Sequence, residues 1–113
     1  MYQVNILTLY PEYFPGLLNA GNYKRARENK IWDYKVINLR EFAGSDHRAD
    51  DKPFGGGSGM IIRAEVISEA LKKYKNEFEK VLLSPRGSKL DQNLVNNYSK
   101  QNGINLICGH FEG

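Results

Sequence analysis

Apolar residues gather in four short runs along the chain, separated by segments that carry turn-forming and polar residues. The runs lie at residues 4–9, 34–38, 80–83 and 104–108. Apolar runs of this length are typical of strands, which are shorter than helices. The pattern therefore predicts four strands, and we expect those at residues 4–9, 80–83 and 104–108 to be buried.

Helical periodicity appears between these runs. Residues 64–74 place their apolar side chains on one face of an amphipathic helix, at Val66, Ile67, Ala70, Leu71 and Tyr74. Residues 88–91 have the form of a capping box and predict a helix whose inward side chains are Leu90, Leu94, Val95 and Tyr98.

The connection between the first two strands is broken by turn-forming residues. Pro15 and Gly16, and then Gly21, divide it into two short helical pieces. Asn22 is a plausible N-cap for a basic helix that runs to Lys30.

Strands that alternate with helices of about ten residues indicate an α/β fold with a mainly parallel sheet, and we assign residues 1–113 to a single domain. A parallel sheet is normally covered on both faces. Because no helix follows the last predicted strand, we expect the domain to continue beyond Gly113.

Composition narrows the class of protein. The chain has 113 residues, a net charge of +3 and a pI near 9.0, which is compatible with a polyanionic partner. The single cysteine excludes an internal disulfide, and the two histidines give no zinc spacing. Neither a membrane-spanning run nor a signal peptide is apparent, so we expect a cytoplasmic protein without a membrane partner.

Four basic residues cluster in the predicted helix before the second strand, at Lys24, Arg25, Arg27 and Lys30, with only Glu28 opposing them. A solvated helix face explains such a cluster, and so does a patch that contacts phosphates. The sequence leaves both interpretations open.

Residues 47–60 hold the least usual composition in the chain, with two acids, a basic pair, a proline and four glycines. This composition opposes both a helix and a regular strand, and it favours close approach of the backbone to a ligand. Met60 stands where a Walker A loop or a dinucleotide fingerprint requires glycine, which argues against a nucleotide-hydrolysing enzyme. Two interpretations of this segment remain: a flexible lid, or a surface on which a base or a backbone docks.

Asp50 and Asp51 allow three interpretations: a solvated acidic turn, hydrogen bonding to a base edge, or a general base or Mg²⁺ contact. His47 is interpreted as a structural or surface residue. We interpret Cys108, at the end of a strand, as part of the core.

Two polar, glycine-bearing turns follow predicted strands, at residues 84–87 and 109–113. Ligands of open α/β sheets bind beyond the carboxyl ends of the strands. If the two strands are neighbours, both turns wall one pocket, in which backbone groups read a ring edge and Phe111 packs against it. The alternative to a ligand pocket is that the polar residues and glycines serve only to form the two turns.

Four segments together resemble the bacterial tRNA (guanine-37-N1)-methyltransferases of the TrmD type, in the knotted SPOUT class. The segments are residues 7–12 with Phe14; His47-Arg48, Asp50-Asp51, Pro53-Phe54-Gly55-Gly56-Gly57 and Gly59-Met60; Leu83-Ser84-Pro85 with Gly87; and residues 108–113. His110, Phe111 and Arg86 depart from the residues that are usual in that family.

The resemblance implies a homodimer that transfers a methyl group from S-adenosylmethionine to N1 of guanine-37 in tRNA. It assigns cofactor binding to Leu83, Ser84, Pro85, Gly87, Gly109, Phe111, Glu112 and Gly113. It assigns substrate binding to His47, Arg48, Asp50, Asp51, Gly55, Gly56, Gly57 and Gly59.

The resemblance covers the N-terminal half of such enzymes. It implies that the knot closure, the third pocket loop, the aspartate base and a helical C-terminal domain lie beyond Gly113, so that no catalytic base is expected in this chain. The alternatives are a non-catalytic RNA-binding or dimerising half of such an enzyme, and a nucleotide-binding regulatory domain.

Overall fold

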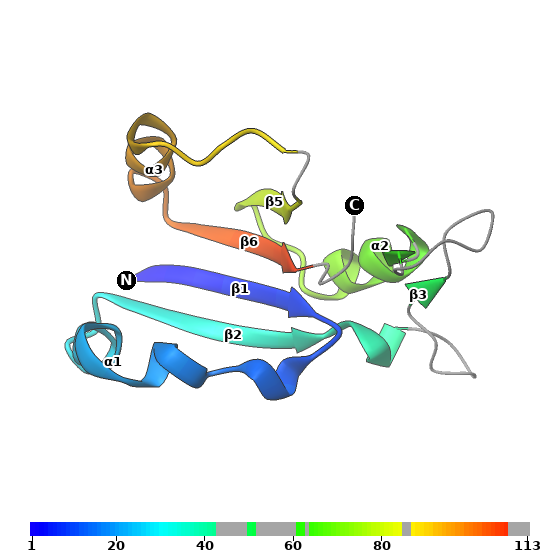
Figure 1. Cartoon of the computed structure of the whole chain (residues 1–113), viewed down its shortest axis with the longest axis horizontal. Coiled ribbons are helices and arrows are strands. Elements are labelled where there is room, and N and C mark those ends of the chain that lie inside the picture. Colours follow the sequence, from blue (N-terminus) through cyan, green and yellow to red (C-terminus); the bar gives the residue numbers. More distant parts are fainter. Residues whose placement is uncertain (43–49, 52–60, 63, 85–86, 109–113) are drawn as a thin grey trace.

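Four parallel strands form the centre of the computed structural model (Figure 1). The structure describes residues 1–42, 50–51, 61–62, 64–84 and 87–108. The strands are β1 (Tyr2–Thr8), β2 (Trp32–Asn38), β5 (Glu79–Leu83) and β6 (Gly103–Cys108), arranged in the order β2-β1-β6-β5. Each neighbouring pair runs parallel, which confirms the α/β class with a mainly parallel sheet.

Helices of two kinds connect the strands. The α-helices are α1 (Gly21–Glu28), α2 (Ala64–Lys73) and α3 (Gln92–Ser99). The 3-10 helices are η1 (Pro11–Tyr13), η2 (Gly16–Asn19) and η3 (Leu39–Phe42), and the first two confirm the two short helical pieces expected before Gly21.

A two-residue ladder lies apart from the main sheet. It pairs β3 (Asp50–Asp51) antiparallel with β4 (Ile61–Ile62). The expectation that residues 47–60 contain no regular strand was therefore wrong at Asp50 and Asp51. Pairing with a segment on the far side of the glycines supplies the backbone partners that the local composition does not indicate.

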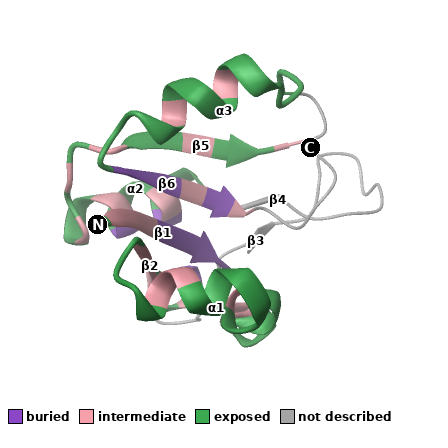
Figure 2. Ribbon diagram, turned by 90° about the vertical axis from the view of Figure 1, so that its left-hand side faces the viewer, coloured by how far each residue is buried: buried purple, intermediate pink, exposed green. Residues whose placement is uncertain are grey.

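The core lies between α2 and one face of the sheet. Val66 and Ala70 of α2 are 1% and 0% exposed, and the cluster that they join contains Leu7, Leu9, Ile37, Leu39 and Ile107. Ile67, Leu71 and Tyr74 pack partly buried against it, which confirms the predicted apolar face of α2. Figure 2 shows the buried residues concentrated in β1 and β6, the central strands.

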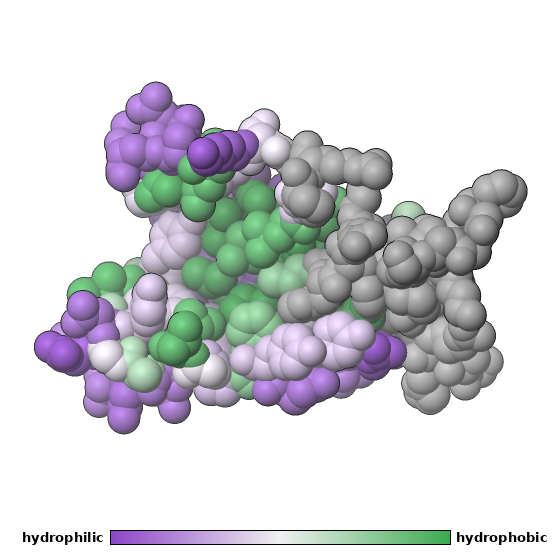
Figure 3. Space-filling model, in the orientation of Figure 1, coloured by the Kyte–Doolittle hydropathy of each residue, from purple (hydrophilic) through white to green (hydrophobic). Residues whose placement is uncertain are grey.

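The opposite face of the sheet is open along its middle. Figure 2 shows α1 and α3 at opposite margins of the sheet, and Figure 3 shows an apolar hollow between these margins. Leu82 and Leu83 of β5 are 58% and 51% exposed. The prediction of a buried strand at residues 80–83 was therefore wrong, because β5 is an edge strand that the described helices leave largely uncovered.

Both predicted helix starts shift in the structure. Asp91 caps α3, and its carboxylate accepts a 2.8 Å hydrogen bond from the Leu94 amide. The capping box at residues 88–91 was thus wrong, and Leu90 lies outside the helix, 63% exposed. Asn22 was a wrong N-cap, because it lies inside α1, whose N-cap is Ala20. The helix begins at Gly21, whose φ of 55° is accessible to glycine.

Candidate functional site

The carboxyl ends of the four strands form a single edge. Thr8 lies opposite Asn38 on one side and Cys108 on the other, and Cys108 lies opposite Leu83. The two strands that carry the polar turns are therefore direct neighbours, as the pocket hypothesis requires. The turns at residues 84–87 and 109–113 both begin at this edge.

A cavity of about 870 Å³ lies between β5, β6 and α3 and reaches the carboxyl edge. Three residues assigned to the cofactor by resemblance, Leu83, Ser84 and Gly87, contribute to its wall. The Gly87 amide donates to the Ser84 carbonyl at 3.3 Å, which closes the turn at the mouth of the cavity. Its floor and sides are mainly apolar, with side chains from Val81, Leu90, Leu94, Val95, Ile104 and Leu106.

A second hollow of about 690 Å³ continues this cavity toward α1. Both are lined by Tyr2, Leu83 and Leu106, so they form one groove across the open face of the sheet. Aromatic rings from Phe14, Tyr23 and Trp32 add to its α1 side. Such a lining favours apolar or flat aromatic groups.

Two of the titratable groups that line the groove have a raised pKa. Burial, with the Glu79 carboxylate and the Tyr98 phenol nearby, raises the pKa of Tyr2, whose hydroxyl donates to the Tyr98 carbonyl at 3.2 Å. Burial also raises the pKa of the half-buried Cys108 thiol, which keeps it protonated and weakly nucleophilic.

Most residues assigned to the site by resemblance lie outside the described residues. On the cofactor side these are Pro85, Gly109, Phe111, Glu112 and Gly113, and on the substrate side they are His47, Arg48, Gly55, Gly56, Gly57 and Gly59. For Asp50 and Asp51 the structure describes the ladder and not the side chains.

The groove also contains two residues to which no role was assigned from the sequence, Tyr2 and Leu106, which face it from the two central strands. Tyr98, which was predicted to point inward from its helix, faces the groove from α3. The strand that carries Leu106 was predicted from the sequence. The face that α3 overlies was not, because it depends on contacts between segments about 100 residues apart.

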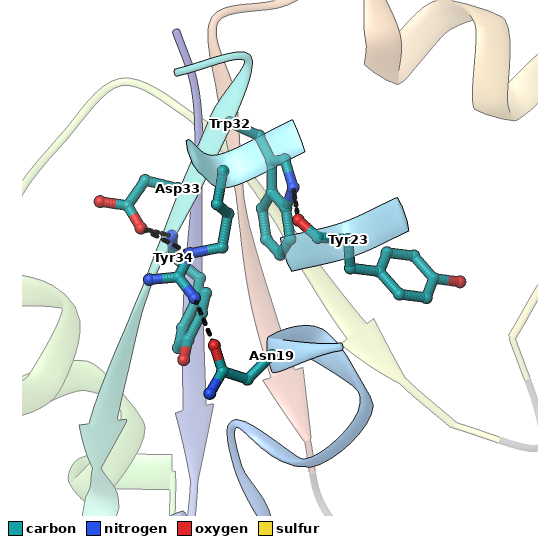
Figure 4. A network of polar contacts seen from close by, with 6 residues as sticks. Asn19, Tyr23, Trp32, Asp33 and Tyr34 are labelled. Carbon is teal, nitrogen blue, oxygen red and sulfur yellow. Dashed lines mark hydrogen bonds and ion pairs between the residues drawn. The ribbon is translucent and has the colours of Figure 1, made fainter. Parts of the chain in front are cut away.

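The basic cluster of α1 is partly used within the fold, as Figure 4 shows around Asn19, Asp33 and Tyr34. Arg27 donates to Asp33 at 3.2 Å and to Asn19 at 3.4 Å, and its guanidinium lies 4.4 Å from the centre of the Tyr34 ring. The Trp32 indole donates to the Tyr23 carbonyl at 3.1 Å. Arg27 thus joins α1 to β2, whereas Lys24, Arg25 and Lys30 are exposed.

The part of the chain that the structure describes contains no set of side chains that could bind a metal ion. No three His, Cys, Asp or Glu side chains come together among those residues. None of the described helices is long and apolar enough to cross a membrane.

Comparison with known proteins identifies the family. Residues 2–113 match the family model described as tRNA (Guanine-1)-methyltransferase TrmD. The chain belongs to this family. The match runs through both strand-end turns and the glycine-rich segment.

Relatives in the TrmD family support the assignment along the whole chain. A tRNA (guanine-N(1)-)-methyltransferase of Pelagibacter ubique is 54% identical over 115 residues, covering 100% of this chain and 50% of the relative. The enzyme of that name from Bartonella henselae is 41% identical over 113 residues, covering 99% and 49%. The chain thus spans about half the length of the relatives that it matches.

A solved structure shows the same fold. The crystal structure of tRNA (m1G37) methyltransferase from Aquifex aeolicus superposes with a TM-score of 0.81 at 34% identity, over 99% of this chain and 52% of that one. The parallel sheet with its flanking helices is therefore the fold of the corresponding half of a TrmD structure.

Proposed function

We propose that the protein, as a tRNA (guanine-37-N1)-methyltransferase, transfers a methyl group from S-adenosylmethionine to N1 of the guanine beside the anticodon. The observation that carries this proposal is the TrmD family match over residues 2–113, with 54% identity to a curated relative along the chain. By the same likeness, we propose a cytoplasmic homodimer with a SPOUT trefoil knot.

The groove at the carboxyl edge suits the methyl donor. The part of the groove between β5, β6 and α3 has a volume of about 870 Å³, which lies within the range of cofactor sites. Its apolar walls suit an adenine ring, and the turn at Ser84 and Gly87 brings backbone N–H and C=O groups to its mouth. S-adenosylmethionine would supply an electrophilic methyl group on a sulfonium.

Residues of this chain would hold and shield the donor. Leu83 would cover an apolar part of it and exclude water, while Ser84 and Gly87 would present polar groups at the edge. Pro85, Gly109, Phe111, Glu112 and Gly113 are proposed to complete the pocket from the two turns. Positioning of this kind, without covalent chemistry by the protein, is what a direct methyl transfer needs.

The guanine would be recognised by the segment that carries the glycines. N1 bears a proton at neutral pH, so its lone pair becomes available only when a carboxylate or another base takes that proton. His47, Arg48, Asp50, Asp51, Gly55, Gly56, Gly57 and Gly59 are proposed to hold the base after it is splayed out of the anticodon loop. We assign the proton-accepting base to no residue of this chain.

The direct test uses the full-length protein with S-adenosylmethionine and unmodified tRNA that carries guanine-37. We expect 1-methylguanosine, identified by mass spectrometry of the digested tRNA, and no product from tRNA with adenine at that position. Stable tRNA binding without product would instead favour the non-catalytic RNA-binding alternative. Displacement of S-adenosylmethionine by ATP would favour the nucleotide-binding one.

We expect Leu83→Glu to weaken S-adenosylmethionine binding by about tenfold or more, because a charge replaces an apolar wall of the groove. Isothermal titration calorimetry measures the Kd, and thermal unfolding monitors the fold. Leu17→Glu is the matched control, since Leu17 is 81% exposed and contributes to neither part of the groove. Equal Kd values for the two variants would contradict the assignment of the groove.

A further inference from the structure

Two lysines lie over aromatic rings on the face of the sheet that α2 covers. The Lys35 ammonium of β2 is 4.4 Å from the centre of the Tyr74 ring. The Lys73 ammonium, at the end of α2, is 5.6 Å from the same ring and 5.8 Å from that of Phe42. The two rings meet edge to face with centres 6.3 Å apart. We call these four residues the lysine–aromatic cluster.

The charges of this cluster are not neutralised within the described structure. No described acidic side chain forms an ion pair with Lys35 or Lys73. On α2, the Glu69 carboxylate pairs with Lys72 at 3.6 Å. Lys35 and Lys73 are exposed, whereas Tyr74 and Phe42 are half-buried against the core.

The rings hold the ammonium groups in place. A free surface lysine loses side-chain entropy when it is fixed. A cation–π contact restricts the side chain before any ligand binds and leaves the N–H donors available to an anion. Ordered and unneutralised ammonium groups are suited to bind a chain of phosphates.

One residue of the cluster, Phe42, is close in sequence to the proposed substrate site. Phe42 ends η3, which follows β2 at the carboxyl edge, and a few residues later the chain reaches His47, the first residue assigned to the guanine. Arg40, also on η3, adds a cation: its Nε donates to the Leu9 carbonyl at 3.0 Å, and its guanidinium lies 5.3 Å from the Tyr10 ring centre.

We propose that the lysine–aromatic cluster binds the phosphate backbone of the tRNA whose guanine is methylated, an inference that rests on the proposed function. The basic residues of α1 are a less suitable surface for this role. Arg27 is engaged with Asp33, and Figure 1 shows α1 beside the amino-terminal ends of β1 and β2, away from the carboxyl edge.

The test compares two full-length variants that each lose two positive charges. Lys35→Gln/Lys73→Gln removes both ammonium groups of the cluster, and Lys24→Gln/Arg25→Gln removes two exposed cations of α1. Fluorescence anisotropy measures the Kd for unmodified guanine-37 tRNA at several salt concentrations. Calorimetry measures the Kd for S-adenosylmethionine, and thermal unfolding shows that each variant is folded.

The cluster variant should bind tRNA about tenfold more weakly in moderate salt and should reduce the slope of log K against log salt by about 1.5, the loss of two phosphate contacts. Its Kd for S-adenosylmethionine should not change. The α1 variant should keep both the affinity and the slope of the unaltered protein. Lys35→Arg/Lys73→Arg, which keeps the charges and the ring contacts, should restore tRNA binding.

Two results would overturn the proposal while leaving the proposed function intact: an unchanged tRNA affinity and salt slope in the cluster variant, or an equal loss in the α1 variant. If the glutamine variant is destabilised and the arginine variant also fails to bind tRNA, the rings and lysines serve packing alone. If the unaltered protein binds no tRNA, the proposed function fails together with this surface.

Discussion

Gly103→Ala should lower the free energy of unfolding by about 3 kcal/mol, a large share of the stability of a domain of this size. Gly103 begins β6 and is buried opposite Gln3 of β1. A Cβ at this position would overlap the backbone oxygen of Gln3 and lie 2.7 Å from Cε2 of Phe78. The backbone oxygen cannot withdraw without disturbing the pairing of the two central strands.

Two opposing contributions to the free energy of unfolding decide whether Gly103→Ala destabilises the protein. Replacing glycine by alanine in a strand ordinarily stabilises a protein by about 0.4–1 kcal/mol through the unfolded chain. The overlap at Gly103 exceeds that gain. Urea denaturation monitored by circular dichroism measures the difference in unfolding free energy between the variant and the unaltered protein.

Gly87→Ala is the matched control for Gly103→Ala. A Cβ at Gly87 would meet only the Ser84 carbonyl oxygen, at an ordinary contact distance of 3.6 Å, so the change in unfolding free energy should stay within about 0.5 kcal/mol. If Gly103→Ala were as stable as Gly87→Ala, the packing of β6 against β1 and Phe78 would be different from that described. Adding Phe78→Leu to Gly103→Ala should recover only part of the loss, because the Gln3 oxygen remains.

The elements of the fold could be predicted because their signals are local. Val66 and Ala70 recur at helical spacing, and they are the α2 residues that the core buries. The apolar runs likewise predicted all four strands of the sheet. Burial of Leu82 and Leu83 could not be judged in the same way, because it depends on what packs on an edge strand, which the residues of that strand do not encode.

In the candidate site, too, the residues with a local signal could be predicted and those that depend on distant contacts could not. Ser84 and Gly87 were predicted as site residues because they follow a strand. That prediction required β5 and β6 to be neighbours, and the pairing of Leu83 with Cys108 shows that they are. Tyr2 was missed because it faces α3 from the other end of the chain. The start of α3 was misplaced because Ser88 and Asp91 are both capable caps, and only the hydrogen bond to the Leu94 amide distinguishes them.

Asn105→Leu should destabilise the protein by about 3 kcal/mol, although it places an apolar side chain of similar size in a buried position. Asn105 is 1% exposed and uses its whole amide. Its oxygen accepts from Asn5 at 3.0 Å and from Asn76 at 3.1 Å. Its nitrogen donates to the Asn76 side chain at 2.8 Å and to the Phe78 carbonyl at 3.1 Å.

Removing this one side chain takes a hydrogen-bond partner from the buried Asn5 and from the half-buried Asn76 and Phe78. The Asn5 amide, 7% exposed on β1, loses its donor contact, and the Phe78 carbonyl loses an acceptor contact. Each buried group left without a partner costs about 1–3 kcal/mol, which outweighs the apolar burial that leucine would gain. The network also joins the turn after α2 to the two central strands, so its loss should loosen β5 relative to β6.

Hydrogen exchange distinguishes this explanation from a general loss of stability. In Asn105→Leu, amides of β5 and of residues 76–78 should lose more protection than those of β1 and β2, since the network ties the former to the sheet. Asn97→Leu, at an exposed position of α3, is the control and should change the unfolding free energy by less than about 0.5 kcal/mol. A stable Asn105→Leu chain with unaltered exchange would mean that water replaces the amide and that the network does not hold the turn against the sheet.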